Sequence, residues 1–293
     1  MKIPSFIFKP VLLFLDKHAS DEKYLSWLFY SRLGYWPDLR HPKSFNEKLQ
    51  WMKLHDHNPL FSLYADKYRV REHIAETIGE KYLIPVLGVY NKVENIDFDS
   101  LPNQFVLKCN HGAGCNVICK DKSKLNRAEV VRKLDIWMAK DFSHFKREYH
   151  YASIERKIIC EQFMVDEESG ELRDYKFFCI GGEIQMIQVD MGRFSRHIRN
   201  IYDKEWNLLD VEISFPRDVS NIIDPPKELE EMKYIAETLS KEFSQVRVDL
   251  YVMNHHVYFG ELTFFSGAGF SKYNPRRFEF DLGSKLHLPI DNE

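Results

Sequence analysis

The sequence V-R-V-D-L-Y-V-M-N-H-H-V-Y-F-G-E-L-T-F spans residues 246–264, and its alternating pattern predicts the antiparallel β-hairpin that decides the fold. A three-residue loop over 254–256 would pair Met253 with Val257, and the same register then places Asp249 opposite Glu261. One face is apolar or small throughout, and we expect it to pack on the core. That face carries Val246, Val248, Leu250, Val252, Tyr258, Gly260, Leu262 and Phe264. A one-residue change in the turn would break this register.

The other face of the hairpin is polar. It carries Arg247, Asp249, Tyr251, Glu261 and Thr263. Two carboxylates directly opposite each other, with Cβ atoms about 5 Å apart, repel each other unless a cation lies between them. Carboxylate oxygens are ligands that suit Mg²⁺, whose shell is usually completed by water and phosphates. Two simpler interpretations stay open: both acids are solvated on an exposed face, or Asp249 forms an ion pair with Arg247.

The second informative stretch is F-V-L-K-C-N-H-G-A-G-C-N, residues 105–116. It predicts an apolar strand that carries Lys108, followed by a glycine-bearing loop over 110–116. Glycines let backbone N–H groups approach phosphate oxygens, and a lysine at the strand end adds a positive charge. The stretch matches neither standard glycine-rich phosphate motif, and an ordinary tight turn explains the two glycines equally well.

Around these two stretches, helices and strands alternate along the chain, which predicts an α/β (α+β) fold. Ser44 and Glu47 form a capping-box pattern at the start of the second of two early helices. Gly181-Gly182 marks a tight hairpin between two strands. The predicted helices lie within 21–57 (two helices) and at 60–78, 127–145 and from 225 onward, and the predicted strands lie at 82–90, 105–109, 157–164, 174–180 and 183–189.

Composition excludes several classes of protein. The 293 residues are 44% hydrophobic with 13 Gly and 12 Pro, which is typical of a folded globular chain. The net charge of −3 gives no electrostatic reason to bind nucleic acid. Five cysteines form no C-x-x-C pair, so neither a disulfide framework nor a zinc ribbon is indicated, and a cytoplasmic location is expected.

The N-terminal stretch M-K-I-P-S-F-I-F-K-P-V-L-L-F-L-D-K-H is the one candidate targeting segment. Lys9 and Pro10 interrupt its apolar run, and no small-residue cleavage site follows. A peripheral contact with the inner face of a membrane through these residues is one interpretation. A helix packed on the domain's own surface is the other.

Taken together, these stretches resemble the ATP-grasp superfamily, and in particular its TupA-like branch of bacterial surface-polysaccharide synthesis. The resemblance rests on S-F-N-E-K-L-Q-W-M-K-L-H-D (44–56), Y-A-D-K-Y-R-V-R (64–71), the two stretches above, I-I-C-E-Q-F-M (158–164) and D-Y-K-F-F-C-I-G-G (174–182). It implies two lobes with ATP between antiparallel sheets. The expected parts are an N-terminal helical extension (1–57), a first lobe with the phosphate loop (58–164) and a second lobe with the metal site (165–293).

The resemblance also implies roles for individual residues. Lys108, Arg71 and Lys176 would contact ATP phosphates, while Glu161 and Asp174 would hold the adenine and the ribose. The loop His111, Gly112, Ala113 and Gly114 would close over the phosphates, and Glu161, Gln162, Phe163 and Met164 would form the hinge that contacts adenine. Asp249, Glu261 and Thr263 would bind Mg²⁺, although Thr263 departs from the asparagine that many relatives carry there.

The implied reaction is amide formation through an acyl phosphate, between a carboxylate, expected to be a uronic acid of a surface glycan or its precursor, and an amine. Arg193, with Arg196 and Arg199, could hold the acyl phosphate or an acidic sugar, and 266–269 could donate backbone N–H groups to the tetrahedral intermediate. A kinase, a glycosyltransferase and a nucleotide-binding scaffold remain alternatives. A glycosyltransferase would be expected to show a D-x-D-like metal motif, and the one such triplet, at 97–99, lies in an apparent loop. The glycan, the amine and the oligomeric state are not indicated by the sequence.

Overall fold

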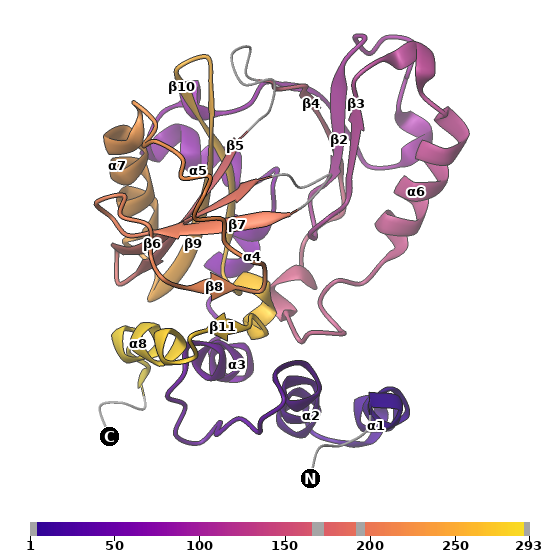
Figure 1. The fold of residues 1–293 in the computed structure, drawn as a ribbon. Helices are drawn as coiled ribbons and strands as arrows, with labels where there is room; N and C mark the ends of the chain where they lie inside the picture. The colour runs from indigo at the N-terminus through magenta and orange to yellow at the C-terminus, as the bar shows by residue number, and fades with distance from the viewer. Residues whose placement is uncertain (1–4, 166–172, 192–196, 290–293) are drawn as a thin grey trace.

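The computed structural model describes residues 5–165, 173–191 and 197–289, which form two antiparallel sheets flanked by helices (Figure 1). Helices α6 and α7 lie at opposite outer sides of the molecule, with the sheets between them (Figure 1). This mixed arrangement of helices and antiparallel sheets agrees with the α/β (α+β) prediction. The domain boundaries at residues 57 and 164 stay predictions.

Three helices open the chain: α1 (Ser5–His18), α2 (Asp21–Leu33) and α3 (Phe45–His55). The predicted capping box is confirmed at α3. The Ser44 hydroxyl accepts from the Glu47 N–H, and the Glu47 carboxylate accepts from the Ser44 N–H at 2.9 Å. This reciprocal pair satisfies donors that the first turn of a helix leaves free.

The predicted single helix over 60–78 is wrong, because the structure has two helices, α4 (Leu60–Ala65) and α5 (Val70–Thr77). The buried Asp66 carboxylate accepts from the N–H groups of Tyr68 and Arg69. Such local side-chain bonds compete with the helical backbone ladder and end it. The connection between the two helices contacts the loop after residue 109, because the Lys67 N–H donates to the Asn110 carbonyl at 3.3 Å.

The first sheet has the order β1-β4-β2-β3. Its strands are β1 (Val86–Tyr90), β2 (Phe105–Cys109), β3 (Asn116–Cys119) and β4 (Ile158–Gln162). Helix α6 (Arg127–Ala139) packs on its outer face. The helix ends six residues before the predicted residue 145, because the Asp141 carboxylate accepts from the backbone and hydroxyl of Ser143 and starts a turn.

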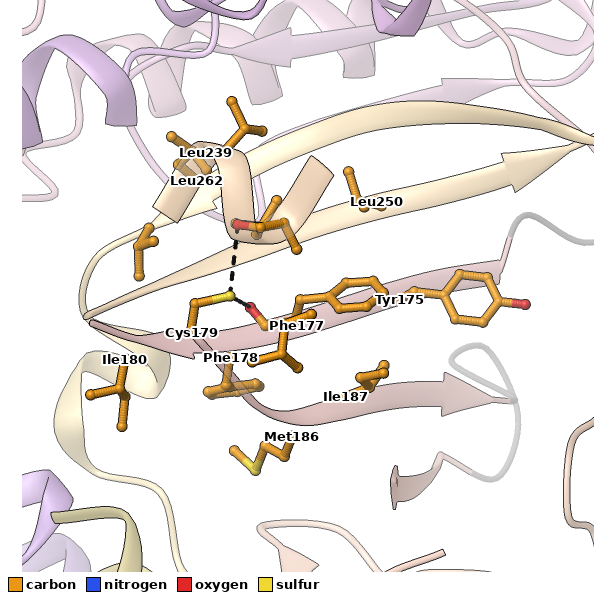
Figure 2. Close-up of a cluster of buried hydrophobic side chains, with 14 of the residues drawn as sticks. Tyr175, Phe177, Phe178, Cys179, Ile180, Met186, Ile187, Leu239, Leu250 and Leu262 are labelled. Atoms are coloured by element: carbon orange, nitrogen blue, oxygen red, sulfur yellow. Dashed lines mark hydrogen bonds between the residues drawn. The ribbon is translucent and has the colours of Figure 1, made fainter. Parts of the chain in front are cut away.

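The second sheet has the order β10-β9-β5-β6-β7. Its strands are β5 (Arg173–Ile180), β6 (Glu183–Met191), β7 (Ile198–Tyr202), β9 (Gln245–Met253) and β10 (His256–Thr263). Helix α7 (Leu229–Ser240) covers its apolar face, and the Cys179 thiol reaches the Ala236 carbonyl of that helix (Figure 2). The predicted Gly181-Gly182 hairpin is confirmed, with both glycines at positive φ.

The predicted three-residue loop at the decisive hairpin is wrong, yet the predicted pair of acids is correct. Asn254 and His255, at φ 48° and 59°, form a two-residue turn that pairs Met253 with His256. A bulge at Gly260 then shifts the register by one residue and restores the pairing of Asp249 with Glu261. A Cβ at Gly260 would lie 2.9 Å from the Tyr251 ring, so the bulge requires glycine.

Between the turn and the bulge, the two-residue turn changes which residues of β10 face the core. Val257 and Phe259 are buried there, whereas Tyr258, which was predicted on the core face, is half-buried on the other side. Beyond the bulge Leu262 and Phe264 face the core as predicted.

A helix near the end of the chain packs against α3, and a small two-stranded sheet adjoins that helix. These elements are β8 (Glu212–Ile213), β11 (Tyr273–Asn274) and α8 (Arg277–Lys285). Short 3₁₀ turns lie at Glu80–Tyr82, Val93–Asn95, Lys122–Lys124, Tyr149–Tyr151 and Ser266–Gly269. The first of these replaces the start of the strand predicted over 82–90.

Candidate active site

Charged side chains form a row across the face of the second sheet that α7 does not cover. The register places Glu261 of β10 beside Asp249 of β9, Asp249 beside Lys176 of β5, and Lys176 beside Gln188 of β6. Side chains of directly paired residues point to the same face of a sheet, so this row shares one surface. Asp249 is 1% exposed and Lys176 is 7% exposed, so their charges are largely removed from water.

Arg247 lies at the centre of the predicted metal ligands. Its guanidinium donates to both oxygens of Asp249 at 2.6 and 2.7 Å, to Glu261 Oε1 at 3.3 Å and to the Thr263 hydroxyl at 3.0 Å. Thr263 in turn donates to Glu261 Oε1 at 3.2 Å. The interpretation of both acids as solvated surface groups is therefore wrong, and the ion pair between Asp249 and Arg247 is present.

Lys176 joins this group to Asp174. Its ammonium lies 2.5 Å from Asp174 Oδ2 and 2.6 Å from Asp249 Oδ2. The structure thus brings together the residue expected at the ribose, the residue expected at a phosphate and one of the expected metal ligands. A buried cation between two buried carboxylates offsets part of the cost of removing those charges from water.

The environment treats the two facing acids differently. Burial raises the pKa of Asp249, against the opposing effect of Arg247 and Lys176. Burial also opposes ionisation of Glu261, but the positive charges of Lys67 and Arg247 prevail and lower its pKa to about 2. Glu261 is therefore a carboxylate at neutral pH, as a cation ligand must be.

Lys67 was missed by the sequence reasoning. Its ammonium lies 3.3 Å from Glu261 Oε2 and donates to the Gly112 carbonyl at 2.7 Å. It therefore connects the glycine-bearing loop of the first sheet to the carboxylates of the second. The available signal was the three cations of the Y-A-D-K-Y-R-V-R stretch, from which only Arg71 was chosen.

A second ion cluster lies on the first sheet. Lys108 of β2 and Glu161 of β4 form an ion pair at 2.6 Å. Arg71 of α5 lies 4.0 Å from the other oxygen of Glu161 and donates to the Ile84 carbonyl at 2.9 Å. Two of the three residues expected at the phosphates therefore flank the acid that was expected at the adenine.

The loop after β2 is fixed at its base and exposed at its tip. Asn110 is buried and donates to Asp66 and to the Glu155 carbonyl, each at 2.9 Å. His111 turns inward, 3.2 Å from the Trp137 carbonyl, and its burial lowers its pKa. Ala113 and Gly114 are exposed, and Gly114 has φ 73°. Only the tip can thus offer backbone N–H groups to a phosphate, and His111 is a packed, neutral side chain.

The predicted hinge begins in β4 and continues beyond it. Glu161 is buried, Gln162 is exposed with its N–H donating to the Pro85 carbonyl at 3.0 Å, Phe163 is half-buried and Met164 is buried. The segment lies just before residues 166–172, which fall outside the described part of the chain.

Helix α3 holds the loop that follows β10. Gln50 donates to the carbonyls of Ala268 and Gly269 at 3.1 and 2.8 Å, and Lys53 donates to that of Ala268 at 2.7 Å. The Ser266 hydroxyl at the start of this loop accepts from Arg247 at 3.1 Å. Polar side chains of α3 thus fix a loop that contacts the ion row directly.

Of the three arginines expected at the substrate, Arg193 and Arg196 lie outside the described residues. Arg199 donates to Asp190 at 2.7 Å, and His197 lies 3.0 Å from the same carboxylate oxygen. Burial opposes ionisation of Asp190, but these two partners hold its pKa well below the usual range. Since Asp190 pairs with Asp174 across β5 and β6, this group extends the ion row toward β7.

The donor set of the ion row fits Mg²⁺. Asp249 and Glu261 present carboxylate oxygens from adjacent strands, beside the hydroxyl of Thr263. Within the described ranges no three His, Cys, Asp or Glu side chains gather closely enough to hold a metal by themselves. Mg²⁺ commonly takes one or two protein carboxylates and completes its shell with water and substrate phosphates, so two acids suffice.

Comparisons with known proteins match the chain to a family. A family model described as TupA-like ATPgrasp matches residues 47–287. No curated protein matches the sequence. In the described part of the chain, no helix is long and apolar enough to span a membrane.

Several solved ATP-grasp ligases show similarity to the chain. The D-alanine–D-alanine ligase from Bacillus anthracis complexed with ATP is 17% identical, with 70% of this chain and 55% of that chain covered and a TM-score of 0.40. The enzyme of the same name from Helicobacter pylori is 15% identical, with 77% and 62% covered and a TM-score of 0.40. An ATP-grasp RimK domain protein from Sphaerobacter thermophilus is 11% identical, with 78% and 68% covered and a TM-score of 0.42. The chain thus spans 55–62% of the length of the two D-alanine–D-alanine ligases.

Proposed function

The chain belongs to the TupA-like ATP-grasp family, within the ATP-grasp ligase superfamily, and on this premise we propose that it is an ATP- and Mg²⁺-dependent ligase. It would join a carboxylate to an amine through an acyl phosphate. The observation that carries the proposal is the ion row on the second sheet. In that row the carboxylates of Asp174, Asp249 and Glu261 alternate with the cations of Lys176, Arg247 and Lys67.

The charge balance of this row suits an anionic nucleotide that carries its own cations. Burying so many charges stabilises a fold weakly, since desolvation offsets most of the attraction between them. A row with equal numbers of acids and cations can exchange partners at little cost. Lys176, Arg247 and Lys67 can turn to phosphate oxygens, while Asp249 and Glu261 hold Mg²⁺, which would neutralise the charge of the transferring phosphate.

Phosphoryl transfer depends mainly on positioning and on cations that offset developing charge, and in this proposal the described residues would provide both. Lys108 and Arg71 on the first lobe would contact phosphate from one side, with the exposed tip at Ala113 and Gly114 closing above it. A substrate carboxylate would attack the γ-phosphate and release ADP. The amine would then attack the acyl carbon, expel phosphate and lose its proton.

The acid substrate we propose is a uronic acid of a bacterial surface glycan or its precursor, and the amine is an amino acid or a similar compound, joined in the cytoplasm. Membership of the TupA-like family supports the glycan. Arg199 supports an anionic substrate near β7, because its guanidinium adjoins the ion row through Asp190.

The test is a screen of ADP release against uronic acids, glycan fragments and amino acids. A ligase releases ADP only when a carboxylate and an amine are both present. Hydroxylamine should replace the amine and trap the acyl phosphate as a hydroxamate. A stable phosphorylated sugar would instead identify a kinase, and nucleotide binding without any ADP release would identify a scaffold.

A further inference from the structure

Helices α1 and α2 form a hairpin at one end of the molecule, away from both sheets (Figure 1). The family match covers residues 47–287, so this hairpin lies outside the matched region. Arg147 fixes the hairpin to the first lobe through Asp16 and Asp21, each at 2.7 Å. We therefore ask what the exposed surface of this attached hairpin could bind.

The outer face of α1 combines apolar and basic side chains. Leu13 is 57% exposed and Phe14 is 63% exposed. At 3.6 residues per turn the exposed positions fall on about half of the helix circumference. This outer arc consists of Lys9, Pro10, Leu13, Phe14, Lys17 and His18, all exposed.

The outer arc carries no acid, although the whole chain has a net charge of −3. Asp16, the acid of α1, lies on the inner side and is held by Arg147 and His144. Lysines beside exposed large apolar residues are typical of a helix that lies in a membrane interface, with apolar groups inserted and ammonium groups at the lipid phosphates.

Aromatic residues connect the opposite side of α1 to α2 and the segment after it. Phe8 lies 6.0 Å from Tyr30, and Tyr30 stacks on Trp36 at 4.6 Å between ring centroids. Trp36 is 48% exposed. Tryptophan and tyrosine are enriched where a protein meets lipid headgroups, because their rings are apolar and their polar groups stay hydrated.

We propose that the outer arc of α1 binds the surface of an anionic lipid bilayer. A second copy of this chain is a poorer occupant, because a symmetric contact would bring the same basic arc against itself. A neutral surface would leave the lysines without partners. An anionic bilayer satisfies the apolar and the basic groups together.

Co-sedimentation with lipid vesicles tests the proposal without any substrate, so its result is independent of the proposed ligase activity. The full chain should sediment with vesicles of phosphatidylcholine and phosphatidylglycerol, and much less with phosphatidylcholine alone. Each lysine near an anionic surface contributes about fivefold to binding, so K9Q/K17Q should lower the partition coefficient by about 30-fold. L13S/F14S should lower it at least as far.

Matched control variants test whether vesicle binding is specific to the outer arc or arises from any exposed apolar or basic side chain. Ile136 on α6 is 54% exposed, and Ile136→Ser should bind vesicles like the wild type. K120Q/K227Q removes two exposed lysines elsewhere and should have little effect. Unchanged melting temperatures would show that the arc variants are folded.

Three results would overturn the proposal. The first is a wild-type chain that does not sediment with anionic vesicles. The second is equal binding by the arc variants and their controls. The third is a wild-type dimer that L13S/F14S converts to a monomer, which would make the arc a contact between copies of the chain.

Discussion

Replacing Glu261 by glutamine removes one negative charge from the centre of the ion row while keeping the shape of the side chain. In the structure this carboxylate faces Lys67 and Arg247, each at 3.3 Å, and accepts from Thr263. The variant leaves two cations facing a neutral amide. We therefore expect effects on both stability and catalysis, and the structure allows each to be sized.

The effect on stability follows from the pKa of Glu261, which falls from 4.5 to about 2 on folding. That difference corresponds to about 3 kcal/mol, and since 31% of the side chain is exposed we discount it to roughly 1–2 kcal/mol. Because the folded pKa is lowered, this contribution is present above pH 4.5 and is lost as the pH falls toward 2. Glu261→Gln should thus lower the melting temperature at pH 7 by about 2–5 °C.

The effect on catalysis should be much larger. Neutralisation of a transferring phosphate by a metal is worth several kcal/mol, so kcat/KM for ATP should fall by about 100-fold or more. ADP release measured against the Mg²⁺ concentration, beside thermal melts, checks both effects. Glu279→Gln is the matched control, because Glu279 is 2% exposed and lies in α8 outside the ion row. Near-normal turnover in Glu261→Gln would refute the metal assignment.

Three further predictions follow from other parts of the structure. Lys108→Ala should raise the KM for ATP or abolish turnover, because it removes a cation expected to contact phosphate and leaves Glu161 with Arg71 at 4.0 Å. Steady-state ADP release and calorimetric ATP binding check this prediction, and an unchanged kcat/KM for ATP would exclude Lys108 from the site. Gln50→Leu should lower kcat at least tenfold with little change in the KM for ATP, because the Gly269 carbonyl loses the Gln50 donor and the Ala268 carbonyl keeps only Lys53. Gln50→Glu, which cannot donate as the amide does, should not rescue the activity, and equal losses of kcat and ATP affinity would contradict this positioning role. Burial lowers the pKa of His150 to about 3, so the folded chain keeps the ring neutral at pH values where the unfolded chain would protonate it. The free energy of unfolding should therefore fall by about 1.4 kcal/mol per pH unit as the pH is lowered from 6.5 to 3. His150→Phe should flatten the dependence of denaturant-derived stability on pH in that range, and an unchanged slope would show that His150 is not the group responsible.

The hairpin explains why the sequence located the acids correctly despite a wrong turn. The predicted hairpin has a three-residue loop and strict alternation, whereas the observed hairpin has a two-residue turn followed by a bulge. Both arrangements place Asp249 opposite Glu261. The glycine that makes the bulge possible is visible in the sequence, but alternation alone assigns it to the core face. The bulge becomes apparent from the strand register of the folded chain, and the space that the Tyr251 ring and the Asp249 carbonyl leave for a Cβ explains why the position is glycine.

Contacts between segments that are distant in the chain could not be predicted from the sequence, for a different reason. Lys67 lies in the connection between α4 and α5, Gly112 in the loop after β2, and Glu261 in β10. Only the folded chain shows that these three residues meet. The role of Gln50 in holding the Ala268 carbonyl likewise joins the N-terminal part to the end of β10. Periodicity reports which face of one element is buried, and it carries no information on which remote backbone group lies there.

The most direct test of the ligase proposal follows oxygen atoms through the reaction. A uronic acid that supports ADP release is labelled with ¹⁸O in its carboxylate and incubated with ATP, Mg²⁺ and the amine. If the carboxylate attacks the γ-phosphate and the amine then displaces phosphate, one ¹⁸O atom must leave with each phosphate released. Mass spectrometry of that phosphate should show one ¹⁸O for each ADP formed. Unlabelled phosphate alongside amide formation, or a stable phosphorylated sugar in its place, would contradict the acyl-phosphate mechanism.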